Sequence, residues 1–385
     1  MSEYIAQGTS LTAVANKIRE KTGDSAPLEF PDDFIAGIDE FTEPPQMPVD
    51  SILFYSRTEF TLGIENKTKN WDGSLYYSTD NNIWIEWSGT TDISSSLYKG
   101  YHRIYLRGVG NTHITRGVIQ AGDDAFRIYG FAVRCIGNLN KLLSYDTDIE
   151  VLTAAYSYCF NYLFYECSNL DFNVQLPSTT ISQYCYAHMF DGCRSMLKAP
   201  DLPATTLAGN CYEYMFQNCK LLKQAPTLPA TILTNSCYYA MFAFTAIEEP
   251  PDLPATELTQ SCYCQMFKNC KHLTKAPALP ATTLATNCYN NMFANCSLIS
   301  ELPELPAQTL MTGCYNNMFI YATSIKLSTT QVDEYQTEFR IPSTETGTDA
   351  TNALQNMFAY TGGSFKGTPT INTTYYTSNT IVPAT

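Results

Sequence analysis

The sequence predicts an α+β protein of several domains, in which a small antiparallel β-sandwich and a long repeat solenoid follow an N-terminal helical segment. Three observations predict this fold class. A cysteine-led unit recurs about every 26 residues over more than half of the chain, a middle region alternates apolar and polar residues between turn signals, and two amphipathic stretches precede a proline-rich spacer. A fixed period of this length is typical of solenoids, in which each unit packs only against its neighbours.

Residues 1–45 form the first predicted domain, a pair of amphipathic helices. Ser10 is a helix-capping residue type just before the first apolar stripe, and Pro31 suits the first turn of a second helix. The two stripes consist of Leu11, Val14, Ile18, Phe34, Ile35 and Ile38. Helices this short cannot bury such faces alone. They could cover the neighbouring β domain, but the spacer EPPQMP at 43–48 favours docking on a separate partner.

Residues 46–130 predict the β-sandwich. The expected strands are ILFYS (52–56), FTLGI (60–64), SLYYS (74–78), IWIEW (83–87) and YHRIYLRG (101–108). On IWIEW, Trp84 should point away from the two isoleucines and Trp87 toward their side. An exposed tryptophan can stack on a sugar ring, so both are candidate ligand contacts. A core position is the commoner outcome, and we expect it for at least one of them.

The repeat occupies residues 158–325, after a transition at 131–157. Its leading cysteines are Cys159, Cys185, Cys211, Cys237, Cys262, Cys288 and Cys314. They are 26 residues apart except for one step of 25. A degraded further copy contains Met357 and Phe358, so residues 326–385 are expected to hold an insert and a C-terminal capping repeat.

Within each unit, apolar residues lie at offsets 0, 1, 4, 5 and 8 from the leading cysteine. These offsets share one face of a helix of about two turns. The following segment, LKQAPTLPA in one copy, contains prolines that exclude helix and restrict strand pairing to the residues around Ala225. Each unit is therefore predicted to run through a helix, a turn and a short parallel strand.

The cysteines are predicted to be buried apolar residues. Cys211 and Cys219 would lie about 12 Å apart on a helix, whereas a disulfide needs Cα atoms within about 7 Å. Thr245 and Ala322 replace the second cysteine in two copies. The eight-residue spacing of the two cysteines in a repeat is not typical of a zinc site, and the four histidines do not cluster with these cysteines. We expect no metal and no cofactor.

Composition narrows the function classes. A formal net charge of −14 disfavours nucleic acid as a partner. The N-terminus lacks the apolar core of a signal peptide, and no apolar run is long enough for membrane insertion. No nucleotide-binding, nucleophile-elbow or zinc-protease motif occurs. Carboxylates near the predicted strands could form a hydrolytic pair. They do not recur at equivalent positions of the copies, however, so an enzyme is not expected.

Other positions vary between copies while the apolar frame stays fixed, and these are the candidate ligand contacts. They are Lys198, Asp201, Lys223, Thr227, Asp252, Lys275 and Glu304. A mixed polar row of this kind is usually a solvated face and sometimes a binding face.

The repeat resembles a known family. The pattern C-Y-x-x-M-F-x-x-C-x-x-L followed by A-P-x-L-P-A-T, seen from Cys185 and from Cys262, resembles the leucine-rich repeats of bacterial surface proteins of the BspA-like type. The resemblance implies a right-handed leucine-rich-repeat solenoid, a role in adhesion and no catalytic residues. Residues Ser10–Phe41 are similar to a short helical module of tail-associated bacteriophage proteins, which implies a helical anchor for virion attachment.

Together these resemblances imply a non-enzymatic phage virion component, such as a tail fibre, tail tip or baseplate-associated adhesin, assembled in the host cytoplasm. Its expected partners are other virion proteins through residues 1–45, a bacterial surface glycan or protein receptor, and copies of itself, a trimer being favoured by analogy with phage fibres. One alternative is a bacterial cell-surface or secreted leucine-rich-repeat adhesin. Another is a tail-associated polysaccharide-degrading enzyme.

Overall fold

The computed structural model describes residues 44–115, 124–146 and 156–384. From Pro45 onward they belong to one compact unit, Pro45–Thr385. The predicted helical anchor lies outside the described residues, as do its apolar positions. These are Leu11, Val14, Ile18, Phe34, Ile35 and Ile38.

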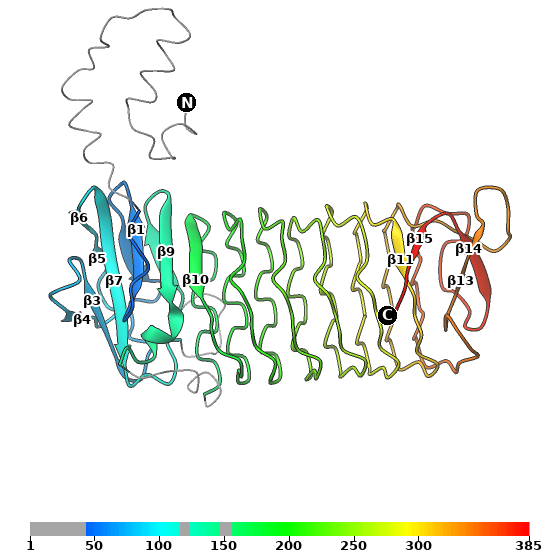
Figure 1. The fold of residues 1–385 in the computed structure, drawn as a ribbon, viewed down its shortest axis with the longest axis horizontal. Coiled ribbons are helices and arrows are strands. Elements are labelled where there is room, and N and C mark those ends of the chain that lie inside the picture. Colours follow the sequence, from blue (N-terminus) through cyan, green and yellow to red (C-terminus); the bar gives the residue numbers. More distant parts are fainter. Residues whose placement is uncertain (1–43, 116–123, 147–155, 385) are drawn as a thin grey trace, which may run out of the picture. The chain divides into compact units, whose positions relative to one another are not determined.

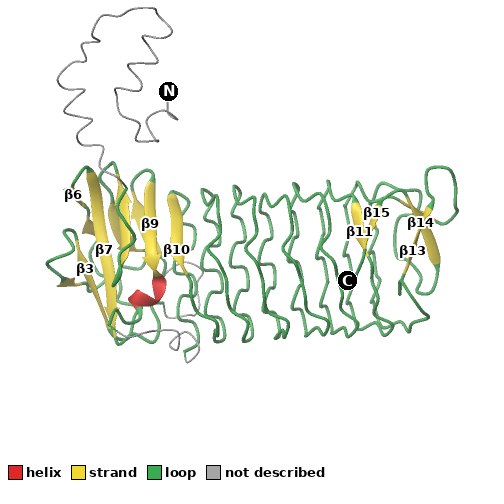
Figure 2. Cartoon of the chain, in the orientation of Figure 1, coloured by secondary structure: helices red, strands yellow, loops and turns green. Residues whose placement is uncertain are grey.

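The described chain consists of strands and turns (Figure 2). The strands are β1 (Ile52–Ser56), β2 (Thr61–Ile64), β3 (Ser74–Ser78), β4 (Ile85–Glu86), β5 (Ile93–Ser94), β6 (Ser96–Tyr98), β7 (Tyr101–Val109), β8 (Phe126–Tyr129), β9 (Val133–Asn138), β10 (Leu170–Gln175), β11 (Glu301–Pro303), β12 (Leu327–Ser328), β13 (Thr337–Arg340), β14 (Thr374–Thr377) and β15 (Thr380–Val382). Within the described ranges, helical structure is confined to the 3-10 turn η1 (Leu139–Leu142). The α+β prediction is therefore wrong for this part of the chain.

Two sheets open the unit. The larger has the order β10-β9-β1-β7-β3-β4, with β6 also on β7, and the smaller has the order β5-β2-β8. β1 pairs antiparallel with β7 and β9, but β10 pairs parallel with β9. The prediction of a purely antiparallel sandwich separate from the repeats is therefore wrong. The chain leaves the sheet after β9, makes the first repeat turns and returns in the same direction as β10, so the sheet becomes mixed.

The repeats form layers that lie side by side along the unit (Figure 1). We call each repeat, counted from its leading cysteine, a layer. In the layer of Cys211 the Tyr212 amide donates to the Cys237 carbonyl of the next layer at 3.0 Å, whereas the Met215 amide donates back to the Tyr212 carbonyl at 3.2 Å. This alternation continues to Cys219. The segment is thus a run of tight turns, and its alternate amides join neighbouring layers.

The predicted helix fails because the apolar offsets fit a four-residue period as well as a helical one. Asn210, Tyr214 and Asn218 have φ of 58°, 54° and 61°. Those values lie in the left-handed region, which a right-handed helix excludes. A left-handed residue at every fourth position bends the chain and turns the pairs at offsets 0 and 1, 4 and 5 to the inside. The same residues are buried, but the backbone that buries them differs.

Most of the predicted parallel strands of the repeats also fail to form, and among the described residues of the layers only β10 and β11 are regular parallel strands. Lys198, Gln224 and Glu249 make isolated parallel bridges from one layer to the next, and the prolines that follow have no amide N–H to extend them. Cross-layer hydrogen bonds come mainly from the turns. The chain is therefore not a leucine-rich-repeat solenoid, in which each repeat adds a strand to a continuous parallel sheet.

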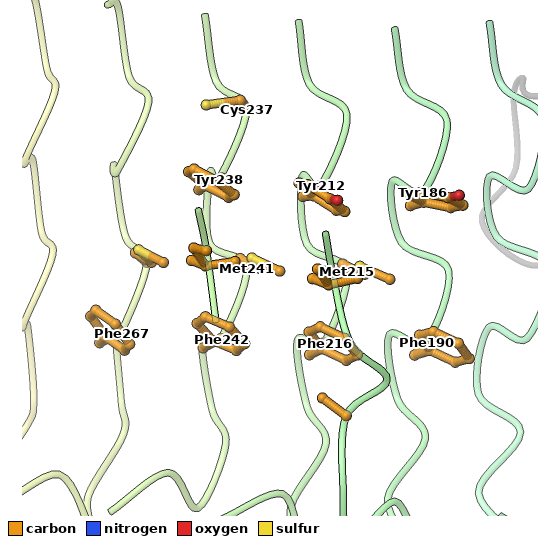
Figure 3. Close-up of a cluster of buried hydrophobic side chains, with 14 of the residues drawn as sticks. Tyr186, Phe190, Tyr212, Met215, Phe216, Cys237, Tyr238, Met241, Phe242 and Phe267 are labelled. Atoms are coloured by element: carbon orange, nitrogen blue, oxygen red, sulfur yellow. The ribbon is translucent and has the colours of Figure 1, made fainter. Parts of the chain in front are cut away.

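A continuous hydrophobic core runs from the sheets through the layers. Figure 3 shows its regularity: the ring of Phe216 stacks on those of Phe190 and Phe242, each at 5.7 Å between centroids. Tyr212 stacks in the same way on Tyr238 at 5.7 Å. All 14 cysteines are buried free thiols, and the predicted burial is confirmed. At the C-terminal end, β14 pairs with β12 and β13, and β15 pairs with β11.

Candidate functional site

Each layer exposes polar residues next to a buried frame. In the layer of Cys211, Pro226 and Leu228 are buried, while Thr227 between them is exposed, because successive side chains of an extended segment point to opposite sides. Lys198, Gln224 and Glu249 bridge in register, so equivalent positions are adjacent in space. We name this surface the variable face. It comprises the exposed residues Lys198, Asp201, Lys223, Gln224, Thr227, Glu248, Glu249, Asp252 and Lys275.

Ion pairs join the layers in the middle of the variable face. Lys223 Nζ lies 2.9 Å from Glu248 Oε1, and Lys275 pairs with Glu249. The hydrogen bond from Lys223 lowers the pKa of Glu248, and the bond to Glu249 raises the pKa of Lys275. Exposed pairs of this kind are weak and exchange readily with other partners. The four charges sum to zero, so this part of the face is polar without a strong field.

Lys198 and Asp201 line a groove beside β10. The groove has a volume of about 380 Å³. Its other wall carries Asn173 and Gln175, which are exposed alternate residues of β10, and Met47 also lines the groove. Of the candidate contacts predicted from the sequence, these two are brought together in a concave site.

The remaining candidates are placed differently. Glu304 is half-buried and accepts a hydrogen bond from the Ala384 amide at 3.1 Å, so it holds the C-terminal segment. Trp87 is only 2% exposed and belongs to the core, as expected for at least one of the two tryptophans. Trp84 is half-buried, and the Arg107 guanidinium covers its ring at 3.8 Å from the centroid. Trp87 is therefore out of reach of a sugar, and Arg107 covers one face of the Trp84 ring.

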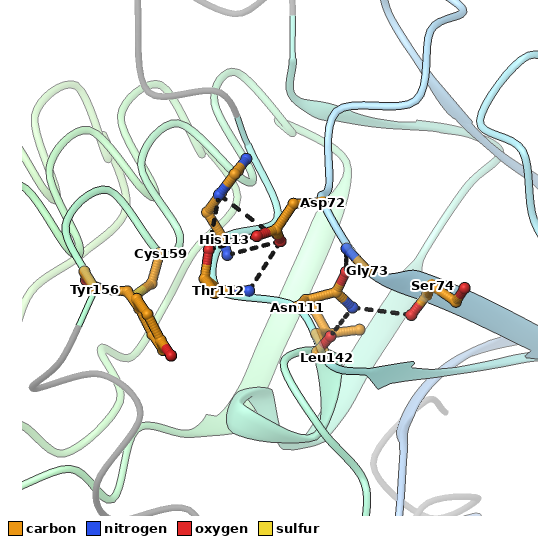
Figure 4. Close-up of polar contacts among 9 residues, drawn as sticks. All are labelled: Asp72, Gly73, Ser74, Asn111, Thr112, His113, Leu142, Tyr156 and Cys159. Atoms are coloured by element: carbon orange, nitrogen blue, oxygen red, sulfur yellow. Dashed lines mark hydrogen bonds and ion pairs between the residues drawn. The ribbon is translucent and has the colours of Figure 1, made fainter.

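A polar cluster near the start of the layers is structural. Asp72 accepts hydrogen bonds from the amide and the hydroxyl of Thr112, at 2.8 and 2.6 Å (Figure 4). Burial opposes ionisation of Asp72, but these bonds and the charge of His113 lower its pKa. Cys159 lies in the same view, but its thiol is fully buried and donates to the Tyr156 carbonyl at 2.8 Å. These side chains fix the join between the sheets and the first layer.

Over 44–115, 124–146 and 156–384 no three His, Cys, Asp or Glu side chains gather as metal ligands would. In the same ranges no helix has the length and apolar character needed to cross a bilayer.

Comparison with known proteins gives no relative. The chain matches no protein-family model, no curated protein and no solved structure. The resemblances to BspA-like repeats and to phage tail modules therefore gain no support from these comparisons, and the site has to be interpreted from its own chemistry.

Sequence reasoning missed the β10 wall of the groove. The alternation in LDFNVQ, with Asp171, Asn173 and Gln175 at every second position, was a usable signal for a half-exposed strand. Met47 carried no such signal, because it lies in a spacer far away in the sequence. Only the parallel return of the chain onto β9 places β10 beside Lys198 and Asp201.

Proposed function

We propose that the protein is a non-enzymatic attachment protein, carried on a phage virion as a tail fibre, tail tip or baseplate-associated component, that binds a bacterial surface through its variable face. One observation carries the attachment role. Polar positions that differ between copies lie in register on adjacent layers, above a frame of buried residues that hardly changes. Each chain would make many weak contacts through this surface. Several chains on one particle would together attach it firmly.

The virion part of the proposal rests on the resemblance of residues Ser10–Phe41 to a helical module of phage tail proteins. Immunogold labelling of purified particles tests it directly. Gold at the tail supports the assignment, whereas labelling of host cell envelopes without particles would favour the bacterial adhesin instead.

The attachment role predicts that neutralising the centre of the variable face weakens cell binding. The variant K223A/E248A/E249A/K275A removes two positive and two negative side chains, so its net charge is unchanged. We expect binding of the fluorescently labelled full chain to bacterial cells to fall several-fold, measured by flow cytometry over a panel of species.

The control is K271A/E257A, which removes one exposed charge of each sign that is not among the residues of the variable face. It should bind cells as the unmodified chain does. The proposal fails if the unmodified chain binds no species in the panel, or if both variants bind equally well.

A further inference from the structure

The groove beside β10 exists because two unlike backbone segments meet there. On one edge β10 pairs with β9 from Leu170 to Gln175. On the other edge it faces the segment 198–203, in which Pro200 and Pro203 have no amide N–H. Within the described residues no backbone hydrogen bond joins these two segments. Backbone hydrogen bonds therefore do not hold β10 and segment 198–203 at the distance of paired strands.

Later junctions differ from this one. There a proline segment lies beside another proline segment, with Pro200, Pro226 and Pro251 at equivalent buried positions. A regular strand next to a proline segment occurs where the mixed sheet ends and the layers continue. The groove is thus a consequence of the transition between two architectures, and its polar lining is not repeated along the chain.

Four side chains with unused hydrogen-bonding capacity face this groove. Asn173 and Gln175 stand two residues apart on β10, about 7 Å along the strand. Lys198 and Asp201 stand on the opposite wall. In the part of the chain that the structure describes, none of the four makes a side-chain hydrogen bond or an ion pair. Their donors and acceptors are free for a ligand.

The chemistry of this lining favours an uncharged ligand rich in hydroxyl groups. The two amides both donate and accept, Lys198 only donates, and ionised Asp201 only accepts. One positive and one negative charge leave the groove without a net preference for ions. Sugar hydroxyls donate and accept at short intervals, which suits such a lining, and Met47 and Pro203 supply apolar contacts for the C–H groups of a sugar ring.

We infer that the groove between β10 and residues 198–203 is a binding site for a neutral saccharide. Its volume of about 380 Å³ falls within the roughly 300–1,000 Å³ of typical ligand pockets. The inference rests on the proposed attachment function and names the class of surface molecule that would be recognised. An extended peptide is less favoured, because the proline wall offers few amide donors to a peptide backbone.

The test uses residues that the chain itself accepts at equivalent positions. In the next layer Gln224 and Thr227 replace Lys198 and Asp201, so the variant K198Q/D201T should fold. The labelled full chain is first applied to an array of neutral and acidic bacterial-type oligosaccharides. The best-binding neutral oligosaccharide is then titrated calorimetrically into each variant. We expect K198Q/D201T to bind about tenfold more weakly or worse, because two hydrogen bonds to charged groups are lost.

The control is K271A/E257A, whose residues belong neither to the groove lining nor to the variable face, and it should bind the saccharide as the unmodified chain does. A second groove variant, N173A/Q175A, tests the opposite wall and should also weaken binding, even if K198Q/D201T does not fold. The inference is overturned if the array shows no neutral saccharide bound, if only acidic glycans bind, or if a folded groove variant retains full affinity.

Cell binding separates this inference from the attachment proposal. If the unmodified chain binds cells and K198Q/D201T loses saccharide binding, both the saccharide site and the attachment role are supported. Saccharide binding that survives in every folded groove variant overturns the saccharide site and leaves attachment standing. Saccharide binding by a chain that binds no cells leaves the groove assignment standing and rejects the attachment role.

Discussion

Left-handed residues define the layers at the residue scale. They recur four residues apart, as at Asn287, Asn291 and Asn295, with φ of 57°, 55° and 62°. Asparagine tolerates this region better than most residues. The asparagines at this spacing were therefore a signal against helix that the apolar pattern concealed, since asparagine is a poor residue inside a helix.

Asn269 offers a decisive test of turn against helix. Its φ is 61°. We expect N269A to destabilise the protein by about 1 kcal/mol, because alanine pays a steric penalty in the left-handed region. N269G should be neutral or stabilising, because glycine adopts this φ freely. Urea unfolding monitored by circular dichroism measures both changes.

A helical layer would reverse this order. Alanine is the best helix former, and glycine is worse by roughly 1 kcal/mol. Finding N269A more stable than N269G would therefore contradict the turn structure.

One layer is the relevant unit at the element scale. A single layer cannot satisfy its alternate amides, because their acceptors lie in the next layer. The second cysteine adds a contact of its own: Cys219 Sγ lies 3.1 Å from the Phe190 carbonyl of the preceding layer. Cys296 repeats this contact with Phe267 at 3.0 Å. Sequence reasoning treated these cysteines only as small apolar residues and missed the weak hydrogen bond.

The phenylalanine stack should make the layers cooperative. Phe242 is fully buried, and its ring lies 5.7 Å from Phe216 and 5.8 Å from Phe267 between centroids. We expect F242A to cost about 3–5 kcal/mol, the usual range for a buried phenylalanine. The measurement is the free energy of unfolding in urea.

Phe131 provides the control, since it is 82% exposed. F131A should change the free energy of unfolding little. An F242A variant as stable as F131A would mean that the stack contributes little packing energy.

The buried thiols should make the whole molecule sensitive to alkaline pH. Burial raises the pKa of Cys211 from 9.0 to about 12, and that of Cys270 from 9.0 to about 11. A raised pKa in the folded state means that the unfolded chain releases these protons first as pH rises. The associated stability is fully present below about pH 9 and is lost between about pH 9 and 12.

Urea midpoints at a series of pH values test this expectation. We expect a steep fall above about pH 9, since each such thiol contributes about 1.4 kcal/mol per pH unit. Adding a thiol reagent at pH 8 supplies the control: the folded protein should not react, because its thiols are buried. A constant midpoint from pH 8 to 11 would show that the thiols are not shielded.

Part of the candidate site followed from the sequence and part did not. Lys198 and Asp201 were predicted as candidate contacts because these positions vary between copies while the apolar frame stays fixed. Asn173 and Gln175 were not predicted as site residues, because their place opposite Lys198 depends on the parallel return of β10 onto β9. That pairing joins residues far apart in the sequence, and no local pattern specifies it.

The sequence by itself determined the period of the repeat, the residues that face the core and the polar positions left outside. These properties follow from residue type and spacing alone. The tertiary structure decided whether the apolar pairs lie on helices or on turns, because offsets 0, 1, 4, 5 and 8 satisfy both. The choice depends on whether an amide such as that of Tyr212 bonds within its own segment or to Cys237 in the next layer. That partner exists only when the layers are stacked.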